Sequence, residues 1–325
     1  MQEILPIHFA PLQGYTEAIY RNAHATCFGG VDTYYTPFVR LEKGNFRNKD
    51  KREIDAENNH VPHLVPQLLA SSAEKAETIL SLFIEKGYKE IDINLGCPFP
   101  LLAKRHNGSG ILPYPEEVEA LLSIVKKYPQ ISFSIKMRLG WENPDECIQL
   151  APFLNELPLR QITMHPRLGK QQYKGEVNLE GFATFQNICK HPLIYNGDIN
   201  SVEEIQVIKD QFPSLAGIMI GRGLLANPAL ALEYKSGEKL SSDEMAKKIR
   251  EMHAIVYQQY EQQLNGGDMQ LVNKMKSFWE YLLPGADKKS LKAIHKSNRI
   301  DKYQQAVSNL INRLSSKNMF IVDKK

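Results

Sequence analysis

Short apolar runs alternate with segments of helical periodicity throughout residues 4–235 of this chain. Eight of these runs have the length and apolar character of buried strands, and they span residues 4–10, 33–39, 63–68, 89–95, 132–137, 161–165, 193–196 and 217–221. Strands that alternate with helices predict a parallel sheet, and right-handed crossovers leave a closed barrel or an open sheet as the choices. Eight units in about 235 residues favour the α/β class and a (β/α)₈ TIM barrel, which typically has ~250 residues.

The segments between the runs carry helix start and stop signals. Ser71 or Ser72 is a suitable N-cap for a helix that Gly87 ends, and Pro115 with two glutamates begins the next helix. Helices are expected over residues 16–28, 72–86, 115–128, 143–154, 179–189, 201–211 and 224–234. Residues 40–60 are polar and charged, and they predict only a weak helix.

Beyond Gly237 the chain has helical periodicity without strand-like runs between the helices, which are expected over residues 243–261, 269–282 and 291–314. We therefore expect two domains, a barrel at residues 1–238 and an all-α helical bundle at residues 239–325. The bundle is expected to end in a short polar tail that contains one apolar patch, Met319–Val322.

The composition is that of an ordinary soluble globular protein, with 42% hydrophobic and 24% charged residues. No apolar run approaches the ~20 residues of a membrane helix, and the first residues lack the features of a signal peptide. The four cysteines, Cys27, Cys97, Cys147 and Cys189, show neither metal-ligand spacing nor a disulfide framework. These features predict a cytoplasmic protein with reduced thiols and no metal or membrane partner, and we expect a monomer.

Charge is distributed unevenly along the chain. From Ser241 onward there are 15 Lys/Arg against 9 Asp/Glu, whereas residues 1–240 have 25 against 28. A basic helical region beside a mildly acidic body suggests a polyanionic partner such as a nucleic acid. Solvated helix faces would give the same count.

The carboxyl ends of the predicted strands carry polar and cationic residues, and in a barrel these ends converge on one mouth. They include Pro11, Leu12, Gln13, Gln67, Asn94, Cys97, Lys136, Arg138, His165, Arg167, Asn196, Gly197, Asp198, Gly221 and Arg222. Gly197 and Gly221 permit close backbone approach before a helix, and Arg222 can add a bidentate contact, which together predict a phosphate site. The alternative is that both glycines are plain turn residues.

Lys136 and His165 end the fifth and sixth predicted strands. A buried lysine is rare unless it is paired, and its charge would suit an electron-rich ring such as a reduced flavin, or the carbonyl oxygens of a base. The amides of Asn94 and Gln67 could read the edge of a planar heterocycle. Beside a flavin, Cys97 would be suited to general acid catalysis, since a thiol of pKa ~8.5 is neutral and can give up a proton. A small filler in a tight turn is the alternative for Cys97.

The chain resembles the tRNA-dihydrouridine synthases, flavin enzymes that reduce selected uridines of tRNA. The resemblance covers residues 4–235 and extends more loosely into the helical region. It rests on Ala10-Pro11-Leu12-Gln13-Gly14, Asn94-Leu95-Gly96-Cys97-Pro98, Asn107-Gly108-Ser109-Gly110, Lys136-Met137-Arg138-Leu139-Gly140-Trp141, Asn196-Gly197-Asp198 and Ile220-Gly221-Arg222-Gly223. Leu12 replaces a more usual Met, Pro166 replaces a more usual Gly or Ala, and residues 99–106 differ from the better-known members.

The resemblance implies FMN as cofactor, NADPH as reductant and tRNA as substrate. It implies FMN contacts from Pro11, Leu12, Gln13, Gln67, Lys136, His165, Asn196, Gly197, Asp198, Gly221 and Arg222. It implies that Cys97 is the proton donor and that Asn94, Arg138 and Tyr173 contact the target nucleotide. Two other readings remain open: an FMN barrel that reduces a free pyrimidine or enoate, and a non-catalytic RNA-binding barrel that keeps FMN as structure.

Overall fold

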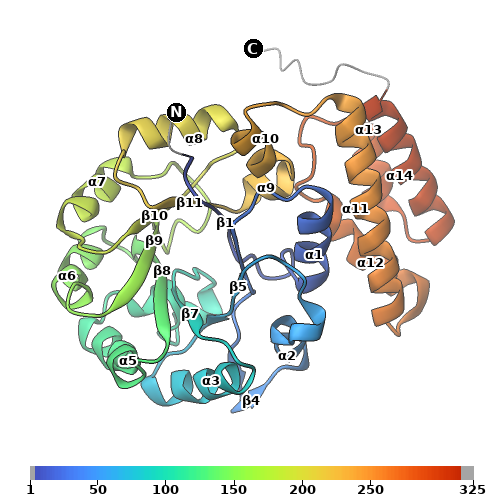
Figure 1. Cartoon of the computed structure of the whole chain (residues 1–325). Helices are drawn as coiled ribbons and strands as arrows, with labels where there is room; N and C mark the ends of the chain where they lie inside the picture. The colour runs from blue at the N-terminus through green and yellow to red at the C-terminus, as the bar shows by residue number, and fades with distance from the viewer. Residues whose placement is uncertain (1–3, 316–325) are drawn as a thin grey trace.

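Parallel strands close into a barrel in the computed structural model, which describes residues 4–315 (Figure 1). Their order around the sheet is β5-β2-β1-β11-β10-β9-β8-β7-β6. Pro66 cannot donate a ladder hydrogen bond, so it divides one strand position into β5 and β6, and through it the two ends of the order meet. The strands are β1 (Ile7–Phe9), β2 (Thr33–Tyr35), β5 (Leu64–Val65), β6 (Gln67–Leu68), β7 (Glu90–Leu95), β8 (Ser132–Gly140), β9 (Leu159–Leu168), β10 (Leu193–Asn196) and β11 (Gly217–Ile220). The predicted barrel is therefore confirmed.

Helices form a layer around the barrel, as Figure 1 shows. They are α1 (Ala18–Cys27), α3 (Ala73–Glu85), α5 (Pro115–Lys127), α6 (Asp145–Leu154), α7 (Leu179–Ile188), α8 (Val202–Gln211), α9 (Arg222–Ala226) and α10 (Leu230–Ser236). The hydroxyls of Ser72 and Ser201 cap α3 and α8 by accepting backbone N–H groups. The helix expected over residues 224–234 is two helices, because Pro228 at the break has no N–H to continue the first.

Residues 40–60 contain more than the weak helix that their composition predicts. A two-stranded antiparallel hairpin, β3 (Leu41–Glu42) and β4 (Asn45–Phe46), precedes α2 (Asn48–Ile54) and the short 3₁₀ helix η1 (Ala56–Asn58). The turn between β3 and β4 is Lys43-Gly44, and both residues have positive φ, 51° and 80°. Two short helices, α4 (Pro100–Ala103) and η2 (Gly108–Ile111), lie in the loop that follows β7.

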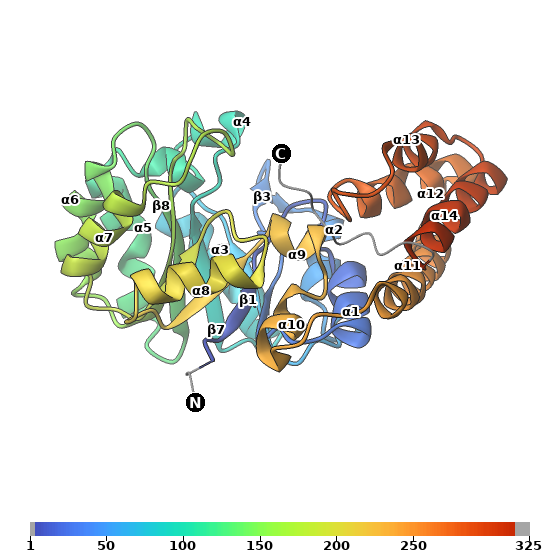
Figure 2. The same ribbon diagram turned by 90° about the horizontal axis from the view of Figure 1, so that it is seen from above.

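A helical region packs beside the barrel (Figure 2). It consists of α11 (Ser242–Gln263), α12 (Gly267–Lys276), the 3₁₀ helix η3 (Ser277–Trp279), α13 (Lys288–Lys296) and α14 (Ile300–Ser315). The helix expected over residues 291–314 is thus interrupted, between α13 and α14. Lys248 Nζ on α11 donates to the carbonyl of Cys27 at the end of α1, 2.6 Å away.

The barrel and the helical region share one continuous apolar core. The expected domain boundary at residues 238/239 follows Gly237, which ends α10 in the left-handed conformation, and the division into two domains stays a prediction. The patch Met319–Val322 lies outside the described residues. Within residues 4–315, no helix combines the length and the hydropathy that a membrane crossing requires.

Candidate active site

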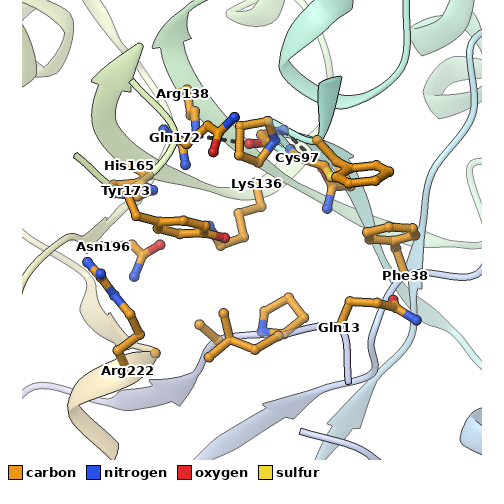
Figure 3. A pocket seen from close by; sticks show the side chains of 18 of the residues that line it. Gln13, Phe38, Cys97, Lys136, Arg138, His165, Gln172, Tyr173, Asn196 and Arg222 are labelled. Atoms are coloured by element: carbon orange, nitrogen blue, oxygen red, sulfur yellow. Dashed lines mark hydrogen bonds between the residues drawn. The ribbon is translucent and has the colours of Figure 1, made fainter. Parts of the chain in front are cut away.

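A cavity of about 730 Å³ opens at the carboxyl ends of the barrel strands (Figure 3). This volume lies in the ordinary range for small-molecule and cofactor sites. Every site residue that the sequence predicts lines this cavity except Gln67. The lining also includes side chains that the sequence did not single out as site residues, among them Phe38, Arg40, Arg47, Phe99, Leu101, Arg105, Gln172 and Tyr281.

Cys97 is held by its backbone from both sides. Asn94 Oδ1 accepts the N–H groups of Gly96 and Cys97, at 3.0 and 2.8 Å. On the other side, the Cys97 carbonyl accepts from the backbone N and the Oγ of Ser109, both at 3.0 Å. Gly108 has a φ of +60°, and a Cβ there would lie 2.6 Å from the Cys97 oxygen. The Asn107-Gly108-Ser109-Gly110 motif therefore forms one half of a backbone clamp on Cys97.

The environment of Cys97 favours a neutral thiol. Burial raises the pKa of Cys97, while a hydrogen bond from the backbone of Phe99 and the charges of Arg138, Lys136 and Arg40 oppose part of that rise. A neutral thiol holds the proton that a general acid must deliver, and nearby cations would stabilise the thiolate left behind.

Gln67 lies beneath the cavity and is fully buried. Its Nε2 donates to Asp92 Oδ2 and its Oε1 accepts from Asn94 Nδ2, both at 2.7 Å. The polar groups of Gln67 are thus engaged within the barrel, which explains why it does not line the cavity. Asn94 lines the cavity, but both ends of its amide are already hydrogen-bonded. Its Nδ2 donates to Gln67, and its Oδ1 accepts the N–H of Cys97.

Two cationic side chains on β8 point toward the cavity (Figure 3). Among the described residues, the ammonium of Lys136 has no hydrogen-bond partner, and burial together with the charge of Arg138 lowers the pKa of Lys136 to about 8. Arg138 Nε donates to the Gly96 carbonyl at 3.0 Å, and its Nη1 donates to the Leu168 carbonyl at 2.9 Å. Lys136 is consequently available to an electron-rich ligand, while Arg138 braces the loop just before Cys97.

Tyr173 extends across the cavity from the loop after β9 (Figure 3). Its ring centroid lies 5.5 Å from the guanidinium carbon of Arg138 and 5.1 Å from that of Arg222. Both distances are within the range of cation–π contacts. The ring therefore lies between two guanidinium groups to which the sequence gives different roles, Arg138 for the nucleotide and Arg222 for FMN.

His165 is buried, and desolvation together with the charges of Arg138, Lys136, Arg167 and Arg222 lowers its pKa well below 6.5. Arg167 Nη1 lies 3.3 Å from His165 Nε2. Since a guanidinium can only donate, Nε2 must be the acceptor, and the neutral ring carries its proton on Nδ1. His165 is thereby set to offer an N–H donor rather than a charge.

Asp198 holds the charged end of the site together. Its Oδ1 accepts from Arg167 Nη1 and from Arg222 Nη2, both at 2.9 Å, and its Oδ2 accepts from Arg167 Nη2. Burial raises the pKa of Asp198, but the hydrogen bonds and charges of the two arginines outweigh it and lower the pKa below its ordinary value. Sequence reasoning noted Arg167 at a strand end but did not predict it as a site residue.

The glycines at the ends of β10 and β11 allow close packing. A Cβ on Gly197 would lie 2.9 Å from Val177 Cγ1, and one on Gly223 would lie 1.9 Å from the Ile199 oxygen. Beside Gly221 the first atom met would be Ala10 Cβ at 3.4 Å, so the backbone there borders open cavity. Asn196 Nδ2 donates to the Met219 carbonyl at 2.8 Å, which ties the ends of β10 and β11 together. Within residues 4–315, no group of His, Cys, Asp and Glu side chains is arranged to hold a metal ion.

Comparison with known proteins identifies the family. The family model for dihydrouridine synthase matches residues 8–315, which is most of the chain. The chain belongs to the dihydrouridine synthase family. It is therefore an enzyme, and the predicted resemblance is confirmed.

Named members of this family match over most of their length. A tRNA-dihydrouridine(16) synthase of Pseudomonas syringae pv. tomato is 30% identical over 243 residues, which cover 72% of this chain and 76% of that protein. The tRNA-dihydrouridine synthase B of Pasteurella multocida is 29% identical over 231 residues, covering 69% and 67%. Among solved structures, a variant of morphinone reductase in complex with tetrahydroNAD has a TM-score of 0.50 at 14% identity, covering 72% of this chain and 87% of that one. That last likeness concerns the barrel fold.

Proposed function

We propose that this protein is an FMN-dependent tRNA-dihydrouridine synthase, which reduces the C5–C6 double bond of specific uridines in tRNA with NADPH as reductant. Membership of the dihydrouridine synthase family supports this proposal. The observation that carries the mechanism is the position of Cys97, whose backbone is clamped at the edge of a cavity rich in cations and amides.

The cavity suits FMN on the evidence of its own side chains. The half-buried ammonium of Lys136, without a hydrogen-bond partner in residues 4–315, is matched to an electron-rich ring system. At the other end, Arg222 and the open backbone at Gly221 suit a phosphate group. Pro11, Leu12, Gln13, Asn196 and Gly197 complete the proposed FMN contacts. When bound, FMN would take a hydride from NADPH and supply one to C6 of the uracil.

The protein would hold the uracil and deliver the proton. Cys97 gives the proton on its Sγ to C5, on the face opposite the hydride. Arg138 and the Nδ1–H of His165 would donate to the carbonyl oxygens of the base, which hold more negative charge as C6 is reduced. Tyr173 offers its ring as a face against which the base or its ribose can pack. The target uridine must leave its stack to reach this cavity.

Two surfaces, one on the helical region and one at the rim of the cavity, suit the rest of the RNA. The helix α13 carries four exposed lysines without an ion-pair partner among the described residues, Lys288, Lys289, Lys292 and Lys296. At the rim of the cavity, Phe99 and Leu101 are 53% and 66% exposed, and Arg105 is exposed beside them. Figure 2 shows α4 and α13 on the same side of the molecule. Lysines would neutralise tRNA phosphates, and Phe99 would stack on a base that flanks the target.

We also propose that the protein acts in the cytoplasm as a monomer.

The test follows the flavin through one turnover. In Cys97→Ala, reduction of bound FMN by NADPH should be nearly unchanged, while oxidation of the reduced flavin by tRNA should slow by ~10²–10⁴ because the positioned proton donor is gone. Cys97→Ser should be nearly as slow, since an alcohol is the weaker acid. Cys189→Ala, a partly buried cysteine away from the cavity, is the matched control.

Single-turnover absorbance measurements separate these steps. If tRNA reoxidises the Cys97→Ala flavin at the wild-type rate, the thiol is not the acid. If wild-type protein binds tRNA but forms no dihydrouridine, a non-catalytic RNA-binding role replaces the proposal. Mapping of dihydrouridine in tRNA from cells that lack and then regain the protein identifies the position reduced.

A further inference from the structure

A buried hydrogen-bond relay runs from the inside of the barrel to the backbone of Cys97. At its inner end, Asp92 Oδ1 accepts from Ser134 Oγ at 2.6 Å and Asp92 Oδ2 accepts from Gln67 Nε2 at 2.7 Å. The relay continues from Gln67 to Asn94 and from Asn94 to the N–H of Cys97. Asp92, Ser134 and Gln67 are fully buried, and Asp92 does not line the cavity. Burial raises the pKa of Asp92, and the two hydrogen bonds and the charge of Lys136 oppose that rise.

The direction of this relay follows from the carboxylate at its end. A carboxylate only accepts hydrogen bonds, whereas a primary amide donates through nitrogen and accepts through oxygen. Asp92 therefore accepts a hydrogen bond from the NH₂ group of Gln67, and this leaves the Gln67 oxygen facing Asn94. Asn94 must then donate its own NH₂ group to Gln67, and its oxygen is left facing the N–H groups of Gly96 and Cys97.

The reverse orientation would release Cys97. If the Gln67 amide turned over, its NH₂ group would face the NH₂ group of Asn94, and Asn94 would turn in response. The NH₂ group of Asn94 would then face the N–H of Cys97, so that two hydrogen-bond donors would lie next to each other without an acceptor. An unpaired buried donor is costly, so the loop would move.

We propose that Asp92 is a positioning residue for the proton transfer, because its carboxylate fixes the direction of the amide relay and so holds Cys97 at the cavity. This inference rests on the proposed function in that it takes Cys97 as the proton donor. Pre-set geometry matters here because a displacement of about 1 Å at a reacting group can cost roughly 100-fold in rate.

The first test removes the carboxylate from the FMN-loaded protein. In Asp92→Ala, the flavin should still be reduced by NADPH at close to the wild-type rate, while its reoxidation by tRNA should slow by roughly 10- to 100-fold. A loosened loop also exposes the thiol and eases the burial that raises the pKa of Cys97. Iodoacetamide should therefore alkylate Cys97 several times faster at pH 8, measured by mass spectrometry without tRNA.

The second test exchanges acid and amide across one hydrogen bond. Gln67→Glu alone places two carboxylates against each other and should disturb Cys97 in both measurements. The double variant Asp92→Asn with Gln67→Glu restores a donor opposite an acceptor, and the carboxylate introduced by Gln67→Glu can still accept from Asn94. The rate of Cys97 alkylation and the rate of reoxidation by tRNA should both return to within about threefold of wild type. This residual difference is smaller than the tenfold change in rate that ~1.4 kcal/mol of activation free energy would give.

These measurements decide between positioning and a general structural role. Faster alkylation in Asp92→Ala, and rescue by the exchange, support the relay. Unchanged alkylation and reoxidation in Asp92→Ala, or an exchange that is no better than Gln67→Glu, overturn it. Should Asp92→Ala fail to fold, the comparison of Gln67→Glu with the double variant still decides. Alkylation needs no tRNA reaction, so the relay is tested even if the proposed function fails.

Discussion

Arg167 and Asp198 form a two-point ion pair in which each guanidinium Nη donates to a separate carboxylate oxygen. Arg167 is almost fully buried, and the carboxylate it holds also accepts from Arg222. A carboxylate repels a phosphate, so we expect Asp198 to aim Arg222 rather than to touch the FMN phosphate itself. The sequence predicted all three residues at strand ends but not this division of roles.

Loss of Arg222 should weaken FMN binding. We expect Arg222→Ala to cost about 2 kcal/mol, the size of a lost charge-assisted hydrogen bond. Titration of FMN into the flavin-free protein, followed by flavin fluorescence, measures this. Arg299→Ala serves as control, since Arg299 is an exposed arginine of the helical region. Equal affinities for FMN in wild type and Arg222→Ala would contradict the assignment, as would a wild-type protein that takes up no FMN at micromolar concentration.

FMN affinity should depend on the protonation of Lys136. Its pKa is lowered from 10.5 to about 8, so in the free protein the ammonium loses its proton as the pH rises through about 8. Below that pH the charge attracts an electron-rich ring, and above it the attraction is lost. We expect FMN binding to weaken as the pH is raised from below the pKa of Lys136 to above it in wild type, and Lys136→Met to bind more weakly with a flatter profile. Parallel pH profiles in the two proteins would exclude Lys136 as the source.

The exposed lysines of α13 should account for part of the salt dependence of tRNA binding. Replacement of Lys288, Lys292 and Lys296 by Gln removes up to three phosphate contacts, which should reduce the slope of log K against log salt by about 2–3. Flavin reduction by NADPH should not change.

A matched control removes the same charge elsewhere. Lys89, Lys126 and Lys190 are also exposed, but each lies just before a strand or at the end of the helix that precedes it, at the opposite end of the barrel from the mouth. The triple Gln variant at these positions should keep the wild-type slope. Equal slopes for the two triple variants would show that α13 does not contact the tRNA backbone.

Phe99 should contribute to binding of the tRNA substrate without any effect on the flavin. A base stacked on an aromatic ring is worth roughly 1–3 kcal/mol, so Phe99→Ala should raise the KM for tRNA by about tenfold. The salt slope should stay unchanged because no charge is lost. Val207→Ala is the control, since Val207 on α8 is 61% exposed and lies away from the cavity. A Phe99→Ala enzyme with the wild-type KM would remove the loop after Cys97 from the RNA interface.

Much of the fold could be predicted because it depends on local patterns. The alternation of apolar runs and helices predicts the barrel, and the carboxyl ends of the strands then predict which residues share the mouth. Lys136 and Arg138 show the same logic at residue level, since they are two apart on β8 and so face the same side.

Other features depend on pairings that a single sequence does not contain. The position of Gln67 beneath the cavity follows from its register with Asp92, and the contact of Asp92 with Ser134 follows from the register of β7 with β8. Alternation along β7 and β8 could have placed Asp92 and Ser134 inside the barrel, but not in contact with Gln67. The β3–β4 hairpin was missed because each of its strands has only two residues, too few to show a period.

The loop that carries Tyr173 joins two halves of the site that, in the proposed function, bind different molecules. Arg167 Nη2 donates to the carbonyl of Gly175 in this loop at 2.5 Å, while the same guanidinium grips the carboxylate that aims Arg222. A ligand at Arg222 would therefore act on a hydrogen-bond network that also includes the loop of Tyr173. If bound cofactor strengthens the binding of the nucleotide by some free energy, bound nucleotide must strengthen the binding of the cofactor by the same free energy. In the proposed function, whichever molecule binds first would therefore help to fix the position of the Tyr173 ring that the second one contacts.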